Sequence, residues 1–95
     1  MDDFKRLPPE LSKNGFQYTL VSRGLRTCIY CQHVTPNFKC YEVFLIKTRP
    51  AEVLFGKQVP AREVLPSNES FGSTAWVFRN KERAIKRFNS LENNL

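Results

Sequence analysis

The sequence predicts an α+β fold, in which a three- to four-stranded antiparallel meander carries one C-terminal helix packed on one face. The chain has 95 residues, which is the size of a single domain. Short runs rich in β-branched and aromatic residues, separated by turn residues, fill positions 16–47. From residue 81 onward, apolar side chains recur instead at steps of three and four. Strands followed by one helix indicate the α+β class.

The ends of the chain are expected to lie outside the regular structure. Pro8 and Pro9 disfavour regular structure, and Asn14-Gly15 is a typical turn pair. The paired asparagines at 93 and 94 end the helix poorly. We therefore expect a flexible lead-in over 1–14, a single α+β domain over 15–92 and a frayed tail over 93–95.

The first strand is predicted at residues 16–21, where polarity alternates. Phe16, Tyr18 and Leu20 would share one face, which is the pattern of a strand with one wet side. The stretch "SRGL" at 22–25 supplies the next turn, with Gly24 free to adopt a positive φ.

Two further strands are predicted around a second turn, "TPNF" at 35–38. The strand before it covers 26–34, and the strand after it covers 40–47. The sequence "CYEVFLIK" is rich in residues that favour β-structure, and Pro50 ends it.

Residues 51–73 are predicted to form a long loop. Val53–Phe55 is a candidate edge strand, and Val59, Val64 and Leu65 are expected to hold the loop against the core. Loops of this length in a compact domain are uncommon and are often functional.

The C-terminal part is predicted as a short strand followed by a helix. Ala75–Phe78 has strand character, and Asn80 is a good N-cap residue. The helix begins at residue 81, and its inward face is expected to consist of Ala84, Ile85, Phe88 and Leu91. Three helical turns are marginal alone, so packing on the sheet must stabilise them.

All three cysteines and the single histidine fall within "TCIYCQHVTPNFKC", residues 27–40. Cys28, Cys31, His33 and Cys40 are the ligand types of a zinc site, but their spacing differs from the usual pairing of two knuckles. A Cys-x-x-Cys redox motif would belong at a helix N-terminus rather than in a strand.

A hairpin with Pro36-Asn37 at its turn gives the favoured interpretation of this cluster. In this register His33 lies opposite Cys40 and Cys31 opposite Glu42, while Cys28 points to the other sheet face. Cys28 and Cys31 then cannot bind one ion, so packing is favoured over a metal site or a cofactor. A register slip of one residue would scatter the cluster.

The basic residues are the candidate binding residues. The net charge is +6, from 15 Lys and Arg against nine Asp and Glu, which favours anionic partners. A solvated helix face is the competing interpretation. The candidate nucleic-acid-binding residues flank the first turn and line the helix: Arg23, Arg26, Arg79, Lys81, Arg83, Lys86 and Arg87.

The order of sheet then helix, with "AWVFRNKERAIKRF" entering the helix, distantly resembles plant AP2-type and integrase arm DNA-binding domains. Those domains lay three strands on the major groove, with the helix behind. The resemblance extends over residues 16–91 at most and implies that Arg23, Arg26, Lys39 and Lys47 on the sheet would contact DNA.

The function expected from these observations is binding rather than catalysis. The sequence has no paired carboxylates, nucleophile–base pair or phosphate-loop glycines, so we expect no enzyme. The leading hypothesis is a small nucleic-acid-associated accessory protein of a bacterium or mobile element. Alternatives are a protein-interaction domain that uses a strand edge or the 51–73 loop, and a zinc-stabilised domain. The lack of an apolar leader or span predicts a cytoplasmic location without membrane contact.

Overall fold

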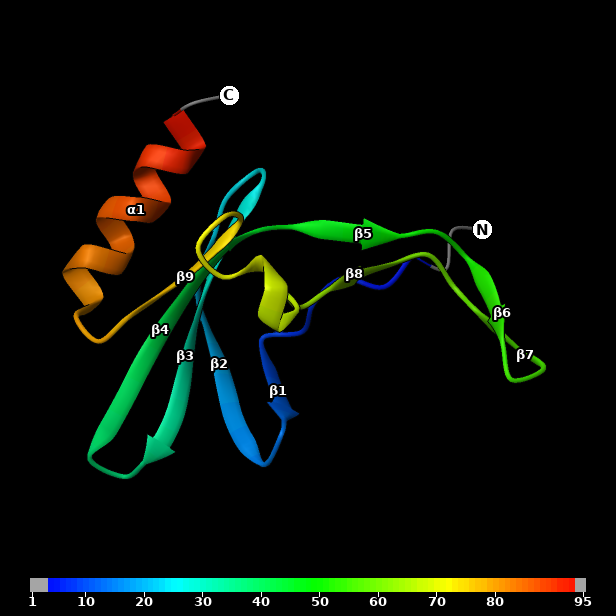
Figure 1. Ribbon diagram of the computed structural model, residues 1–95, viewed down its shortest axis with the longest axis horizontal. Coiled ribbons are helices and arrows are strands. Elements are labelled where there is room, and N and C mark those ends of the chain that lie inside the picture. The colour runs from blue at the N-terminus through cyan, green and yellow to red at the C-terminus, as the bar shows by residue number, and fades with distance from the viewer. Residues whose placement is uncertain (1–3, 94–95) are drawn as a thin grey trace.

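A computed structural model describes residues 4–93 and contains a five-stranded antiparallel sheet, one helix and a protruding β-arm (Figure 1). The predicted α+β class, the meander and the C-terminal helix are confirmed, with five strands in the sheet rather than three or four. The strand order is β1-β2-β3-β4-β9. These strands are β1 (Glu10–Lys13), β2 (Phe16–Arg23), β3 (Thr27–Thr35), β4 (Phe38–Leu45) and β9 (Ala75–Phe78).

The fifth strand, β1, comes from the segment that the sequence placed in the lead-in. Asn14 and Gly15 both have positive φ, 53° and 83°, which is the two-residue type I′ turn that joins antiparallel strands. The turn was predicted, but the strand before it was not, because Pro8 and Pro9 dominate its sequence context. Residues 1–3 of the lead-in and residues 94–95 of the expected frayed tail lie outside the described residues, and Asn93 is the last residue of the helix.

The arm replaces most of the long loop that was predicted for 51–73. Its stem pairs β5 (Lys47–Arg49) with β8 (Arg62–Val64), and its distal hairpin pairs β6 (Glu52–Leu54) with β7 (Lys57–Val59). Pro-Ala occurs at 50–51 and again at 60–61, so both strands are interrupted where the arm bends (Figure 1). A short 3₁₀ helix, η1 (Asn68–Ser70), then leads to β9.

The register between β3 and β4 differs by one residue from the prediction. The turn at Pro36-Asn37 is present, but a bulge between His33 and Thr35 places His33 opposite Lys39 and Cys40 opposite Gln32. The shift allows Val43 to pair with Ile29 on one face and Phe44 to stack on Tyr30 on the other. Apolar packing on both faces thus decides the register.

The sheet has an apolar cluster on each face. On the face away from the helix, Tyr18, Cys28, Tyr30, Phe44 and Ala75 are buried. The chain before β1 and the segment after the arm cover this face, and Tyr30 donates its hydroxyl proton to the Pro8 carbonyl oxygen. The residues that provide this cover include Leu7, Leu65 and Phe71.

The helix α1 (Lys81–Asn93) covers the opposite face. Asn80 caps it, because the Oδ1 atom accepts the Arg83 backbone N–H at 3.1 Å. Ala84 is fully buried against Ile29 and Val43, and Phe88 and Leu91 pack beside it. Ile85, expected on the inward face, is 38% exposed, because it lies one residue beyond the Ala84 row on the helix surface.

Glu92 fastens the end of the helix to the turn between β2 and β3. Its Oε1 accepts the Leu25 N–H at 2.7 Å, and its Oε2 accepts the Arg26 N–H at 3.0 Å. Gly24 does not have the positive φ that was expected. A glycine is needed at this position for a steric reason instead, since a Cβ there would lie 2.2 Å from the Glu92 Oε1 atom.

Candidate nucleic-acid interface

Three basic side chains of α1 line one groove together with an aromatic ring. Arg83, Lys86, Arg87 and Ser90 follow the spacing i, i+3, i+4, i+7, so they form one stripe along the helix. With Phe78 of β9, this stripe bounds an open groove of about 470 Å³. We call this the cationic groove.

The packing of α1 determines where the stripe faces. Because Ala84, Phe88 and Leu91 lie on the sheet, the stripe is turned to the side of β9, the edge strand. Trp76 and Phe78 face the helix there, since β9 pairs Trp76 with Val43. The sequence pattern places basic residues on the helix, and the sheet order places aromatic rings beside them.

Two arginines stack on aromatic rings in this region. The Cζ atom of Arg87 lies 4.8 Å from the centre of the Trp76 ring, and that of Arg79 lies 4.2 Å from the Phe38 ring. A stacked guanidinium is held in orientation, while the N–H groups in its plane can still bind phosphate. Stacking therefore orders these cations without neutralising them.

Among the described residues, the charges of the groove have no acidic partners. The described part of the chain contains two ion pairs, Arg23–Glu63 and Arg62–Glu52, and neither involves the helix. Among the described residues that line the groove, none is acidic. Within the described residues, no ion pair thus neutralises the basic side chains of the stripe.

Lys81 and Arg79 extend the basic surface beyond the groove, to the start of the helix. Both side chains are exposed. Positive charge beside a helix N-terminus opposes the helix dipole and lowers stability slightly. Four of the five candidate residues in this region thus lie on α1, Arg79 lies just before it, and three of the five share the groove.

Arg23 is separated from the other candidates and is neutralised. It lies on the opposite face of the sheet, paired with Cys28, and its Nη1 and Nη2 atoms bind the two Glu63 carboxylate oxygens at 2.8 and 2.5 Å. The Glu63 side chain is only 6% exposed. The hydrogen bonds from Arg23 lower the pKa of Glu63 despite its burial, and the pair raises the pKa of Arg23.

Arg26 lies at the turn between β2 and β3 with its side chain exposed. Its backbone N–H is the one that Glu92 accepts, so the turn is fixed even though the guanidinium is not. Lys39 is exposed beside the turn between β3 and β4, and Lys47 is exposed on the arm. The residues implied by the resemblance to DNA-binding domains are therefore spread over several elements.

The four candidate metal ligands are divided between the two faces of the sheet. Cys28 is fully buried beside Tyr30, whereas Cys31 lies on the helix face with Thr19 and Tyr41 as its neighbours. His33 is bonded to the Thr19 hydroxyl at 3.0 Å. Within residues 4–93, no three His, Cys, Asp or Glu side chains lie close enough together to hold a metal ion.

The cysteine environments do not favour thiolate chemistry. Burial raises the pKa of the Cys28 thiol to about 11, with Arg23 offsetting only part of this effect. Burial also raises the pKa of Cys31. A reactive thiol needs the opposite shift, so these two cysteines act as small packed side chains.

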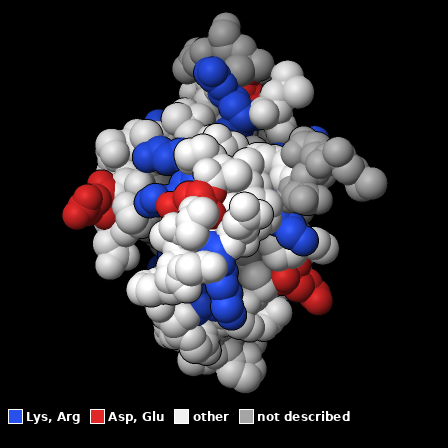
Figure 2. Space-filling model, turned by 90° about the vertical axis from the view of Figure 1, so that its right-hand side faces the viewer, with Lys and Arg blue, Asp and Glu red and all other residues white. Residues whose placement is uncertain are grey.

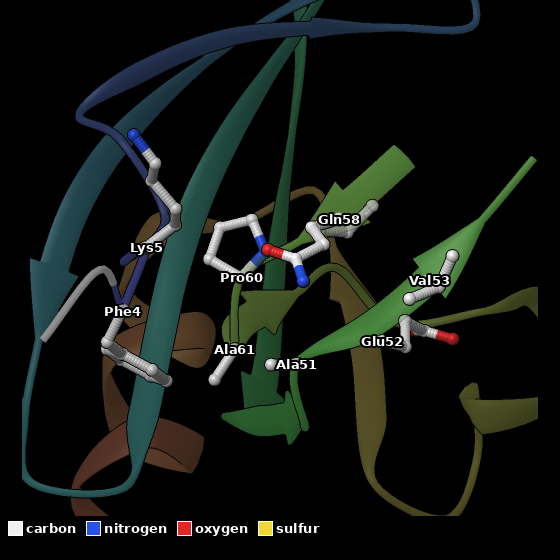
Figure 3. A pocket seen from close by; sticks show the side chains of 9 residues that line it. Phe4, Lys5, Ala51, Glu52, Val53, Gln58, Pro60 and Ala61 are labelled. Carbon is white, nitrogen blue, oxygen red and sulfur yellow. The ribbon is translucent and has the colours of Figure 1, made fainter. Parts of the chain in front are cut away.

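A larger hollow of about 860 Å³ lies between the N-terminal segment and the arm. Figure 3 shows Phe4 and Lys5 on one side and Val53 and Gln58 on the other. The hollow is lined mainly by apolar side chains, and its acidic residue, Glu52, is paired with Arg62. The described residues that line it include one cation, Lys5, and no group of side chains suited to catalysis.

The distribution of charge differs between the sides of the molecule. Viewed from the arm, basic side chains are scattered among acidic and uncharged ones (Figure 2). The cationic groove belongs to the helix at the opposite end of the molecule (Figure 1). Basic residues that share a groove are therefore a better indication of a site than the net charge.

The aromatic side of this groove is only partly predictable from the sequence. Trp76 with Phe78 before the helix is most simply interpreted as a core anchor, with stacking on a base as the rarer alternative, and nothing local shows that β9 becomes an edge strand. The order of strands in the sheet decides this. An aromatic pair directly preceding a basic helix was the available signal.

Comparison of the chain with protein-family models, curated proteins and solved structures finds no match. Within residues 4–93, no helix combines the length and the apolar character needed to cross a membrane.

Proposed function

We propose that the protein is a small binding module that contacts nucleic acid through the cationic groove. The observation that carries this proposal is the convergence of Arg83, Lys86 and Arg87 with Phe78 in one groove lined by no described acidic residue. Basic side chains attract the phosphate backbone, and the half-buried Phe78 ring in the groove offers an apolar surface to a base or sugar. The contact is expected to be weak and sensitive to salt.

Arg87 supports the proposal through its position over Trp76. The indole keeps the guanidinium flat beside the groove, so less side-chain entropy is lost when it binds a phosphate. Lys86 supplies a mobile point charge on the same stripe. This combination favours recognition of the backbone over recognition of a base sequence.

The test is a titration of a labelled oligonucleotide at about 50 and about 200 mM salt. Each phosphate contact contributes a slope of roughly −0.9 in log K against log salt for duplex DNA. Replacing Arg83, Lys86 and Arg87 with Gln should weaken binding at low salt at least tenfold and reduce the slope by up to about three.

A control variant with the same change in charge separates the groove from the net charge. Lys5→Gln, Arg6→Gln and Lys13→Gln also removes three positive charges, on the N-terminal side of the sheet. It should weaken binding far less than the groove variant. Equal losses in the two variants would mean that net charge alone drives binding, and affinity that is indifferent to salt would exclude the proposed backbone contact.

A further inference from the structure

The tip of the arm has an unusual residue in a demanding turn. Phe55 and Gly56 join β6 to β7 with φ values of 52° and 77°. The same chain makes the same kind of turn at Asn14-Gly15, with φ values of 53° and 83°. Asn tolerates the first position of a type I′ turn, whereas an aromatic residue with positive φ is strained there.

The residues at this tip are also exposed. Phe55 is 102% exposed, Val53 is 65% exposed and Leu54 is 40% exposed. An aromatic side chain at this position therefore lowers stability through backbone strain and gains no burial in return. Strained residues of this kind concentrate at functional sites.

The arm behind the tip, stem and distal hairpin together, has an excess of positive charge. Lys47 and Arg49 on β5 and Lys57 on β7 are exposed. Both acidic residues of the described arm are held in ion pairs, Glu52 with Arg62 and Glu63 with Arg23. The arm is thus a basic two-stranded ribbon with an apolar end.

We propose that the arm is a wedge for duplex DNA. The ribbon lies along a groove with its three free cations at the phosphates, and Phe55 enters between two base pairs. Apolar side chains inserted in this way partly unstack and kink the duplex, most easily at pyrimidine–purine steps such as TA. This second contact rests on the proposed function for the class of its ligand, and it is made by a different element.

The spacing of the cations favours a polyanion over a lipid surface. Arg49 is six residues from Phe55, and Lys47 is eight, which is roughly 20 Å or more of extended chain. A group inserted into a membrane interface sits ~5–10 Å deep, and charges are screened within ~8 Å. Only Lys57 would be close enough to interact electrostatically with lipid headgroups, whereas the phosphates of a duplex can contact all three cations.

A second copy of the chain is a poor partner for the tip. Each copy has a net charge of +6, so two approaching arms repel each other. The tip offers three apolar side chains, whereas stable interfaces bury at least ~1,200 Å².

The experiment uses duplexes in which 2-aminopurine, an adenine analogue whose fluorescence is quenched by stacking, replaces the adenine of a central TA step. The wild-type protein should raise its fluorescence, and less so at a step within a GC run. Phe55→Asn should abolish the rise. Because Asn fits the turn and Phe55 lies outside both apolar clusters, this variant should keep the circular-dichroism spectrum and the unfolding temperature of the wild type, so lost signal cannot be attributed to misfolding.

Leu25→Ser is the matched control, because it removes an 85% exposed apolar side chain from a different turn. It should leave the fluorescence rise intact. An equal rise for the wild type and Phe55→Asn would overturn the wedge. So would sedimentation with phosphatidylserine vesicles that Phe55→Asn abolishes, with no change in fluorescence on DNA.

Failure of the wedge can be told apart from failure of the groove proposal. Replacing Lys47, Arg49 and Lys57 with Gln should reduce the salt slope by up to about three and reduce the fluorescence rise. If the groove variant binds as wild type while Phe55→Asn loses the signal, the groove proposal fails and the wedge stands. If the groove variant loses affinity and no duplex shows a rise, only the wedge fails.

Discussion

At the scale of single residues, the ion pair between Arg23 and the Glu63 carboxylate shows how an arginine that looks solvent-exposed in the sequence becomes structural. In the sequence, Arg23 belongs to a turn beside Arg26 and looks available to a ligand. In the structure, it joins β2 to β8 through two hydrogen bonds to a carboxylate that is 6% exposed. Glu63 also accepts the Leu7 N–H at 2.9 Å, so it ties three segments together.

Arg23→Met should lower the free energy of unfolding by about 3 kcal/mol, because it leaves Glu63 buried without a charge partner. Denaturant unfolding measures the loss. The double variant Arg23→Met, Glu63→Gln removes the stranded charge, keeps an acceptor for the Leu7 N–H and should recover much of the stability. Both variants are expected to bind nucleic acid as the wild type does. Weakened binding by both would indicate that Arg23 contacts the nucleic acid directly.

The pKa of Glu42 is shifted in the opposite direction to that of Glu63, so the two carboxyls have opposite effects on how stability depends on pH. Burial raises the pKa of Glu42, and the Tyr18 hydroxyl at 3.3 Å offsets this effect only in part. The folded state therefore holds this proton more tightly than the unfolded state. Its contribution to stability is present below the ordinary pKa, about 4.3, and is lost as pH rises through the higher folded value.

Glu42→Gln should therefore stabilise the protein at pH 7 and make little difference at pH 4, where the wild-type carboxyl is largely protonated. Chemical unfolding at the two pH values measures this difference. A variant that is destabilised equally at both pH values would show that the charge of this carboxylate does not lower stability at pH 7.

At the scale of elements, the arm is separate from the packing of the sheet. The two apolar clusters contain no residue from 50–61. The Pro-Ala pairs at 50–51 and 60–61 interrupt both strands, and Arg62 and Glu52 bridge the interruption at 3.0 Å. The distal hairpin thus contributes little to the stability of the rest.

Replacing residues 50–61 with Asn-Gly, so that Arg49 and Arg62 flank a type I′ turn, should shift the thermal unfolding midpoint by less than about 4 °C. Circular dichroism during heating measures the midpoint. The variant should also lose the fluorescence response of the duplex probe. A much larger drop in the midpoint would mean that the distal hairpin supports the sheet.

The sequence predicts the long elements well and the arm poorly, for a physical reason. β2, β3, β4 and α1 are periodic over eight or more residues, which is enough to identify them. The arm strands have three residues each, which is too short to show an alternation of side chains. Only β6 corresponds to a strand expected from the sequence, the candidate at Val53–Phe55. The β3–β4 register was wrong because a bulge at Val34 leaves no trace in the alternation of side chains.

For the candidate groove, the basic residues could be predicted from the sequence, but the position of the aromatic residues beside them could not. Arg83, Lys86 and Arg87 are on one helix, and their spacing can be read from the sequence. Phe78 and Trp76 join them because β9 pairs with β4 at the edge of the sheet, which is a long-range contact. Helical spacing identifies the cations, and only tertiary structure identifies the groove.

At the scale of the whole molecule, positive charge is poorly balanced. The chain has 15 basic residues, and its described part contains two ion pairs. Repulsion among like charges lowers the stability of a compact state, and salt screens it. The cations that favour an anionic ligand therefore reduce the stability of the free protein.

Raising NaCl from about 20 to about 300 mM should increase the thermal unfolding midpoint by a few degrees. Calorimetry at both salt concentrations measures the change. The variant with Gln at 83, 86 and 87 should start from a higher midpoint and respond less to salt. A midpoint that falls with salt would show that attractive pairs outweigh the repulsion.

The arm also has a consequence for how the chain folds. Residues 46–74 separate β4 from β9, so the last strand of the sheet must close a long loop. Once β5 and β8 zip together, Lys47 lies beside Val64, and the loop that remains is less than half as long. Closing the shorter loop costs about 0.8 kcal/mol less conformational entropy, which corresponds to roughly a fourfold increase in the rate at which β9 pairs with β4.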